Sequence, residues 1–170
     1  ITKRKYRPYS SREKVRERKN LLNRETYLAS VMDLHSKKIV GYSFSRSMTT
    51  DLVMTALGNA YSTQKPAKGL LLHTDLGSQY TSSAFMQYVQ SRGIIQSFSQ
   101  KGCPYDNACI ESFHAILKKE EVNHVQYQDY HTAKLAMFQF IEGWYNRKRI
   151  HSSLDYNTPQ KVEDQIRQSA

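Results

Sequence analysis

The sequence has few cysteines, glycines and prolines, and no long apolar run. Cys103 and Cys109 are the only cysteines among 170 residues. They are too few for a disulfide framework and lack the partners of a zinc site, so two reduced thiols are expected. No apolar stretch reaches the roughly 18 residues of a membrane-spanning helix, and no signal peptide opens the sequence. These absences predict a cytoplasmic protein without a membrane segment and with one core of ordinary size.

The positive charge is concentrated near the N-terminus. The net charge is +10, and residues 1–24 hold ten Lys and Arg side chains against two Glu, a net +8. The remaining residues carry fifteen basic and thirteen acidic side chains, a net +2. Such a block is either an arm that contacts nucleic acid or a solvated charged segment. In the first interpretation, salt-sensitive phosphate contacts without sequence preference come from Lys3, Arg4, Lys5 and Arg7.

Turn residues and apolar periodicity predict strands that alternate with helices. Strands are expected at Thr26–Leu34, Lys38–Phe44, Gly69–Leu72 and Ile94–Phe98, the third of them buried on both faces. Helices are expected from Thr50 (as the cap) to about Tyr61, from Ser82 or Ser83 to Arg92, over Ala108–Glu120, and over about Thr132–Tyr145. The buried face of the first helix is expected to consist of Leu52, Val53, Ala56, Leu57 and Ala60. We therefore predict an α/β layer architecture, with an arm or linker over residues 1–24 and a core over residues 25–170.

Two acidic residues stand where a metal site can form. Asp75 follows the third expected strand, just before a glycine turn, and Glu111 lies in the first turns of the helix that begins at Ala108. Ligands bind at the carboxyl edge of open α/β sheets. Clustered carboxylates suit Mg²⁺, and two such ions about 3.5–4 Å apart can activate an attacking oxygen and stabilise a leaving one. Taken singly, Asp75 also fits a turn residue and Glu111 a charge at a helix N-terminus.

Several motifs, in order, resemble one protein family. They are VMDLHSKKIVG at residues 31–41, HTDLGSQY at 73–80, KGCPYDNA at 101–108, ESFH at 111–114, and the C-terminal signature within residues 145–159. These blocks resemble the OrfB-type transposases of bacterial insertion sequences, whose core is similar to retroviral integrase. The resemblance covers roughly residues 25–165. It implies a ribonuclease-H-like mixed sheet flanked by helices, and a three-carboxylate (DDE) site with two Mg²⁺ ions, Mn²⁺ being an alternative metal.

The resemblance also implies an activity and partners. The activity is cleavage of DNA strands followed by strand transfer during transposition. The partners are transposon ends and target DNA, on which copies of the chain assemble as a homo-oligomer. The protein is accordingly expected at the bacterial nucleoid.

Further residues are assigned to DNA contact. In the resembled family a basic residue at the position of Lys118 contacts DNA near the site. Lys118 lies two helical turns after Glu111 on the same face, although it also fits an ordinary charged helix end. Asn107 is a motif residue beside the site and also a plausible helix cap. Arg147 and Arg149 are candidates for phosphate contact, whereas Trp144 is expected in the core.

The family's first catalytic aspartate has no counterpart in this sequence. It belongs to the first strand of the resembled core, about 18 residues before the position of Asp33, yet no aspartate precedes Asp33. The chain passes from linker-like residues 20–24 directly into Glu25 and the second strand. The missing strand is central in the resembled fold, so its removal leaves two half-sheets with unpaired backbone groups, each costing about 1–3 kcal/mol.

We therefore hypothesise that the functional polypeptide contains this strand. A genuine deletion, which would leave a catalytically inactive relic or regulator that only binds DNA, is the alternative. Asp33 is expected to shape the hairpin turn and not to replace the missing acid.

Overall fold

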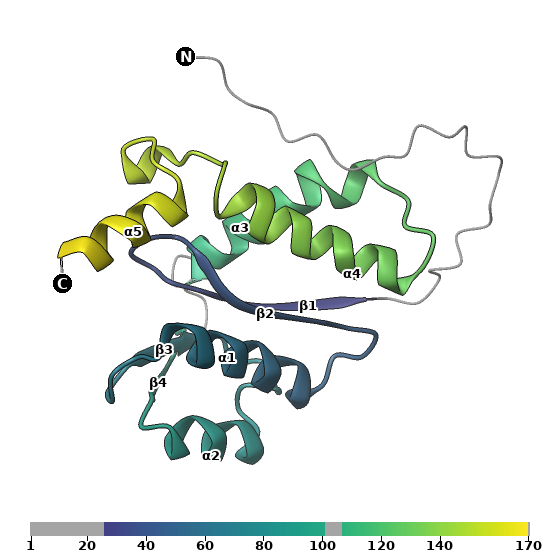
Figure 1. The fold of residues 1–170 in the computed structure, drawn as a ribbon. Helices are drawn as coiled ribbons and strands as arrows, with labels where there is room; N and C mark the ends of the chain where they lie inside the picture. Colours follow the sequence, from purple (N-terminus) through teal and green to yellow (C-terminus); the bar gives the residue numbers. More distant parts are fainter. Residues whose placement is uncertain (1–25, 101–106, 170) are drawn as a thin grey trace. The chain divides into compact units, whose positions relative to one another are not determined.

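The computed structural model describes residues 26–100 and 107–169. These residues divide into two compact units, which we describe separately (Figure 1). Among the described residues, the sheet unit comprises residues 26–32, 39–100 and 107–112, and the helical unit comprises residues 33–38 and 113–169. The expected boundary at residue 24, the arm residues Lys3, Arg4, Lys5 and Arg7, and Cys103 lie outside the described residues.

The strands of the sheet unit form two separate pairs. β1 (Tyr27–Met32) pairs antiparallel with β2 (Ile39–Ser45). β3 (Leu71–Thr74) pairs in parallel with β4 (Ile95–Phe98). No further strand of the described residues joins either pair. Two half-sheets of this kind are what the sequence predicts for a core that lacks its central strand.

The prediction of a strand buried on both faces at residues 69–72 is wrong. β3 begins two residues later, because Gly69 adopts a positive φ of 87° that turns the chain before the strand. Leu71 of β3 is 64% exposed, and its partner Ile95 on β4 is 58% exposed. A short apolar run indicates a buried strand only where other elements cover both faces, and Leu71 lacks such cover within the described residues.

The two half-sheets support the hypothesis that the functional polypeptide carries one more strand. The hydroxyl of Ser30 in β1 is also buried and has no hydrogen-bond partner among the described residues. We expect intact-mass spectrometry of the native protein to give a value above the 19.8 kDa of these 170 residues. Peptide mapping should place additional residues between Arg24 and Glu25. A peptide that joins Arg24 directly to Glu25 would instead support a genuine deletion.

Helix α1 (Thr50–Gln64) packs against the β1–β2 pair (Figure 1). Its buried residues are the five that the periodicity predicted, namely Leu52, Val53, Ala56, Leu57 and Ala60. The helix cap is Thr49 and not the predicted Thr50. Thr49 has an extended backbone, and its hydroxyl accepts a hydrogen bond from the N–H of Leu52 at 3.3 Å, whereas Thr50 is already helical.

Helix α2 (Ser83–Ser91) contributes to the same core. Ser82 caps the helix, as expected, by accepting the N–H of Phe85. Phe85 and Val89 are buried in a cluster with Ala29 of β1 and the buried face of α1. Gly93 ends this segment with a φ of 67°, in the left-handed region that favours glycine.

The helical unit contains the larger part of α3 (Ala108–Glu120), whose bounds match the sequence prediction. The single helix expected over residues 132–145 is instead α4 (Tyr130–Phe138), followed by the π-helical segment η3 (Gln139–Tyr145). The N–H of Asn146 bonds to the carbonyl of Ile141, five residues back. Apolar periodicity does not separate this wider turn from an α-helical one.

Two short turns and a further C-terminal helix complete the helical unit. The turns are the 3₁₀ segments η2 (Val122–His124) and η4 (Ser152–Leu154), and the helix is α5 (Pro159–Ser169), whose bounds the sequence did not predict. Across both units, none of the described helices combines the length and the apolar character needed to cross a membrane.

Candidate active site

Asp75 lies directly after β3, with an exposed side chain. Its Oδ1 accepts the N–H of Gly77 at 2.8 Å, so the carboxylate shapes a tight turn. A Cβ on Gly77 would lie only 2.8 Å from the same oxygen, so a larger residue here would require the Asp75 side chain to move. Burial, and secondarily the negative charge of Asp75, raise the pKa of the Tyr80 hydroxyl. The turn role is confirmed, and the second carboxylate oxygen can bind a cation at the same time.

Glu111 lies in the first turn of α3 and Lys118 in the last, and both side chains are exposed. An acid at the N-terminal end and a base at the C-terminal end both interact favourably with the helix dipole. Glu111 therefore also fits a charge at a helix N-terminus, and Lys118 also fits an ordinary charged helix end. His114 between them is half-buried. Burial, and then the positive charge of Lys118, lower the pKa of His114, so this imidazole is neutral at pH 7.

A chain of hydrogen bonds connects the end of β3 with the start of α3. The side-chain amide of Asn107 donates to the hydroxyl of Ser99 at 2.7 Å. The Ser99 hydroxyl in turn lies 3.3 Å from the carbonyl of Thr74 and 3.1 Å from Nε2 of His73. The elements that carry Asp75 and Glu111 are thus linked within the sheet unit. The sequence did not indicate this role of Ser99, and the predicted capping by Asn107 stays a prediction.

The donor types near β3 and α3 suit a hard divalent cation. Asp75 and Glu111 both offer exposed carboxylate oxygens, the ligand type that Mg²⁺ prefers. Within residues 26–100 and 107–169, however, no group of three or more His, Cys, Asp or Glu side chains is placed to hold a metal ion.

Asp33 has the expected structural role in the β1–β2 turn. Its Oδ1 accepts hydrogen bonds from the backbone N–H groups of His35 and Ser36, at 3.0 and 2.6 Å, and from the Ser36 hydroxyl at 2.9 Å. Lys37 follows with a φ of 60°. An oxygen with three donors is already satisfied, so Asp33 is a turn residue.

The C-terminal motif contains both core and surface residues. Trp144 is buried, as predicted, and its indole N–H donates to Glu120 at 3.0 Å. The other carboxylate oxygen of Glu120 lies 3.7 Å from Nε of Arg149, so Arg149 also has a structural partner. Arg147 is exposed. The DNA contacts of both arginines stay predictions.

His151 lies beside these residues within the helical unit. Its ring packs edge-to-face with the ring of Tyr145, with the ring centroids 5.1 Å apart. Burial first, and then the positive charges of Arg149 and Lys37, lower the pKa of His151 to about 4. The imidazole is therefore neutral at physiological pH and adds no positive charge for DNA contact.

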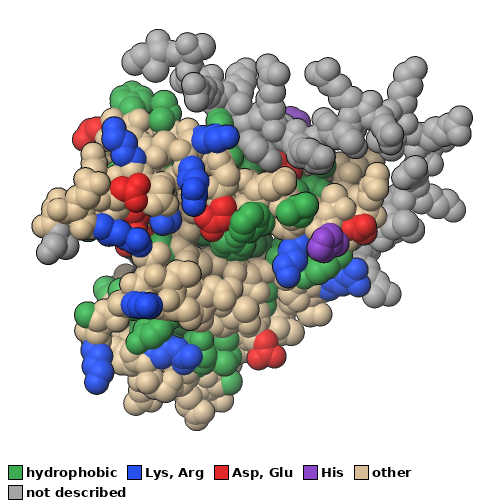
Figure 2. Space-filling view, viewed as in Figure 1, with side chains coloured by type: hydrophobic (Ala, Val, Ile, Leu, Met, Phe, Trp, Pro, Cys, Tyr) green, Lys and Arg blue, Asp and Glu red, His purple; other side chains and the backbone are tan. Residues whose placement is uncertain are grey.

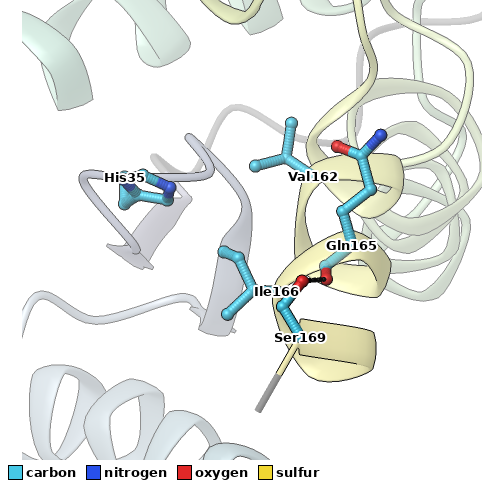
Figure 3. A pocket seen from close by; sticks show the side chains of 5 residues that line it. All are labelled: His35, Val162, Gln165, Ile166 and Ser169. Atoms are coloured by element: carbon cyan, nitrogen blue, oxygen red, sulfur yellow. Dashed lines mark hydrogen bonds between the residues drawn. The ribbon is translucent and has the colours of Figure 1, made fainter.

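An open groove of about 420 Å³ lies within the helical unit (Figure 3). Its lining residues are His35, Val162, Gln165, Ile166 and Ser169. The Ser169 hydroxyl donates to the backbone carbonyl of Gln165 at 2.8 Å, along one side of the groove. None of these side chains is acidic, so the groove is not the predicted metal site.

Solved structures with the same architecture define the class of fold. The catalytic core domain of HTLV-2 integrase, in a complex with magnesium described as a trimeric form, aligns with a TM-score of 0.56 and 16% identity. The alignment covers 81% of this chain and 91% of that domain. The intasome of simian T-cell lymphotropic virus aligns with a TM-score of 0.57 and 17% identity, over 73% of this chain and 43% of that one. The fold is therefore α/β and ribonuclease-H-like, as predicted.

Sequence comparison identifies the family. Residues 13–104 match the integrase core domain family, and residues 92–159 match a second family with the same description. The chain belongs to the integrase core domain family. It is 44% identical over 137 residues to the transposase for insertion sequence element IS904 of Lactococcus lactis, and 37% identical over 138 residues to transposase InsF of IS3A from Escherichia coli. These alignments confirm the resemblance to insertion-sequence transposases.

The chain spans about half the length of these relatives. Each alignment covers 81% of this chain, but only 54% of the IS904 protein and 48% of InsF. A third relative, an uncharacterized 31 kDa protein of insertion element IS600 from Shigella sonnei, is 36% identical over 85% of this chain and 53% of its own length.

Proposed function

We propose that this chain is the catalytic core of a DNA transposase, which cuts DNA strands and transfers them to a target in a metal-dependent reaction. The observation that carries the proposal is the hydrogen-bonded link from Thr74 through Ser99 to Asn107. It joins the two elements that carry Asp75 and Glu111, so that their carboxylates can serve one metal site. The family membership and the transposase relatives support the same conclusion.

Asp75 and Glu111 would hold Mg²⁺, or alternatively Mn²⁺, in this proposal. Bound divalent ions activate the attacking oxygen of water or of a DNA 3′-hydroxyl and stabilise the leaving oxygen. The Gly77 N–H orients Asp75 by holding one of its oxygens. Lys118, seven residues after Glu111, would bind a DNA phosphate beside the site, with Asn107, Arg147 and Arg149 as further contacts. The third acid would come from the additional strand.

DNA is the proposed substrate, as transposon ends and as target. A homo-oligomer assembled on DNA fits this role, since one structural relative is described as trimeric and another forms an intasome. We propose the nucleoid-containing cytoplasm as the place of action.

A cleavage and joining assay tests the proposed function. The protein is incubated with Mg²⁺ or Mn²⁺ and an end-labelled duplex that carries a transposon end, either intact or pre-cut. We expect cleaved strands from the intact duplex and joined products from the pre-cut one. DNA binding without either product would favour the inactive relic. This alternative is specific because only two carboxylates, Asp75 and Glu111, are assigned to a site that is expected to need three. Cleavage without joining would indicate a nuclease.

The N-terminal arm is proposed to supply much of the non-specific DNA affinity. On the face of the molecule in Figure 2, Lys and Arg side chains of the described residues stand singly or in small groups, without a continuous basic surface. Replacing Lys3, Arg4, Lys5 and Arg7 with Ala should lower the slope of log affinity against log salt by about 3.6, since each lost phosphate contact removes about 0.9. Fluorescence anisotropy at several salt concentrations measures this slope.

A matched control removes the same charge from exposed positions elsewhere. Its four substitutions to Ala are at Lys68, Lys134, Lys161 and Arg167. We expect a smaller change of slope in this variant. An equal change in both variants would contradict a specific role of the arm.

A further inference from the structure

Ser99 is the central residue of a polar cluster behind the candidate site. It follows β4, and its side chain is only 9% exposed. Its hydroxyl contacts Asn107, Thr74 and His73, at 2.7, 3.3 and 3.1 Å respectively. A buried hydroxyl with three partners from three segments of the chain is well suited to hold those segments in a fixed arrangement.

The proton positions in this cluster follow from the number of donors. A hydroxyl has one proton and two acceptor lone pairs. The Asn107 amide donates to the Ser99 oxygen, and the Ser99 proton points to the Thr74 carbonyl, which accepts only. His73 must therefore donate through Nε2–H, while its Nδ1 lies 3.2 Å from the Ser97 hydroxyl. With a proton on Nε2 of His73, all three contacts of Ser99 are satisfied.

β4 also fixes the loop that carries Asp75. The side-chain amide of Gln96 donates to the Thr74 hydroxyl at 3.2 Å and to the Tyr80 carbonyl at 3.1 Å. Thr74 and Tyr80 bracket the turn that contains Asp75. Gln96 of β4 thus holds the turn that contains Asp75, and Ser99, which follows β4, holds the start of α3.

We propose that Ser99 and Asn107 are positioning residues that set the separation between the Asp75 and Glu111 carboxylates. Glu111 lies four residues after Asn107, about 6 Å along the helix axis. The hydrogen bond that holds Asn107 therefore also restricts the position of Glu111 on the same helix. Mg²⁺ requires nearly ideal octahedral geometry with ligands at about 2.0–2.1 Å, so a small displacement of α3 weakens binding. The inference rests on the proposed function, because it assigns both carboxylates to one metal site.

The test compares Ser99→Ala with Ser97→Ala, a matched control whose hydroxyl contacts His73 on the neighbouring strand. Hydrogen exchange followed by mass spectrometry reports the opening of the first turn of α3, and calorimetry with Mn²⁺ alone reports metal affinity. We expect Ser99→Ala to speed exchange over residues 107–112 about tenfold, as for the loss of one hydrogen bond, without a change in α1. Its Mn²⁺ affinity should fall about 10- to 100-fold, as for other residues that orient metal ligands.

Three further variants examine the same bond. Asn107→Ala should reproduce both effects. The double variant with Ser99→Ala should be no worse than either single one, because both substitutions remove the Asn107–Ser99 hydrogen bond, which is the contact of Ser99 that reaches α3. Ser99→Thr keeps the hydroxyl and should restore slow exchange. The proposal is overturned if Ser99→Ala changes neither quantity, if Ser97→Ala changes both equally, or if exchange also rises throughout α1.

Failure of the proposed function has a different signature. The metal-site assignment is wrong if the parent protein binds no Mn²⁺, or if Asp75→Asn binds Mn²⁺ as tightly as the parent. The expected effect of the Ser99–Asn107 hydrogen bond on metal affinity then fails as well. The exchange pattern of residues 107–112 then still supports or overturns the link between Ser99 and α3.

Discussion

Replacing Asp75 with Asn, or Glu111 with Gln, is expected to lower magnesium-dependent DNA strand cleavage by at least about 100-fold, since metal stabilisation of the transition state contributes several kcal/mol. The amide side chains have almost the same shape as the carboxylates but carry no charge. A neutral oxygen is a poorer ligand for a hard divalent cation. DNA affinity should stay within about twofold, because it comes mainly from Lys and Arg contacts to phosphates.

A denaturing gel of end-labelled DNA measures the cleavage, and anisotropy measures the binding. Asp51→Asn is the matched control, because Asp51 is an exposed acid in the first turn of α1 and has no place in the proposed site. This variant should cleave like the parent. Retained cleavage combined with lost DNA binding, in either the Asp75 or the Glu111 variant, would refute the assignment of these carboxylates.

Replacing Gly41 with Ala is expected to destabilise the sheet unit by about 3 kcal/mol or more, at the upper end of the usual cost of overpacking. Gly41 lies in β2, where the backbone of α1 comes close. An added Cβ would lie 2.5 Å from the carbonyl oxygen of Ala56 and 2.5 Å from the nitrogen of Ala60. Both are backbone atoms, so the strand and the helix would have to move apart.

Thermal unfolding followed by circular dichroism measures this effect. The midpoint should fall by at least about 6 °C, at 2–4 °C for each kcal/mol in a chain of this size. Gly143→Ala is the matched control, since its added Cβ would meet no atom within 4 Å. Gly143 lies in the helical segment η3, so Ala should be neutral or stabilising by up to about 1 kcal/mol. Equal midpoints for both variants would contradict the close packing of β2 on α1.

Helix positions were predictable because their signals are local. The bounds of α3, the buried face of α1 and the cap of α2 at Ser82 follow from apolar spacing and capping residues only a few positions apart. The turn role of Asp33 has the same origin, since its partners His35 and Ser36 are neighbours in the chain. The one-residue error at Thr49 reflects two adjacent threonines with the same capping chemistry.

Exposure and long-range contacts were less predictable. Leu71 is apolar yet exposed, because burial depends on which elements cover a strand and not on the strand's own residues. The ion pair of Arg149 with Glu120 joins residues far apart in the sequence, so a charge that fits phosphate contact also has a structural partner. The π-helical turns of η3 were missed because their apolar spacing resembles that of an α-helix.

The sequence by itself determined the family resemblance, the two carboxylates Asp75 and Glu111, and the lack of an aspartate before Asp33. These conclusions need only residue types and their spacing. Only the tertiary structure decided that the strands form two separate pairs and that the Ser99 hydroxyl links the end of β3 to the start of α3. Serine is common and carries no local signal for such a role. Its function arises only where packing brings Thr74, His73 and Asn107 within hydrogen-bonding distance of one buried oxygen.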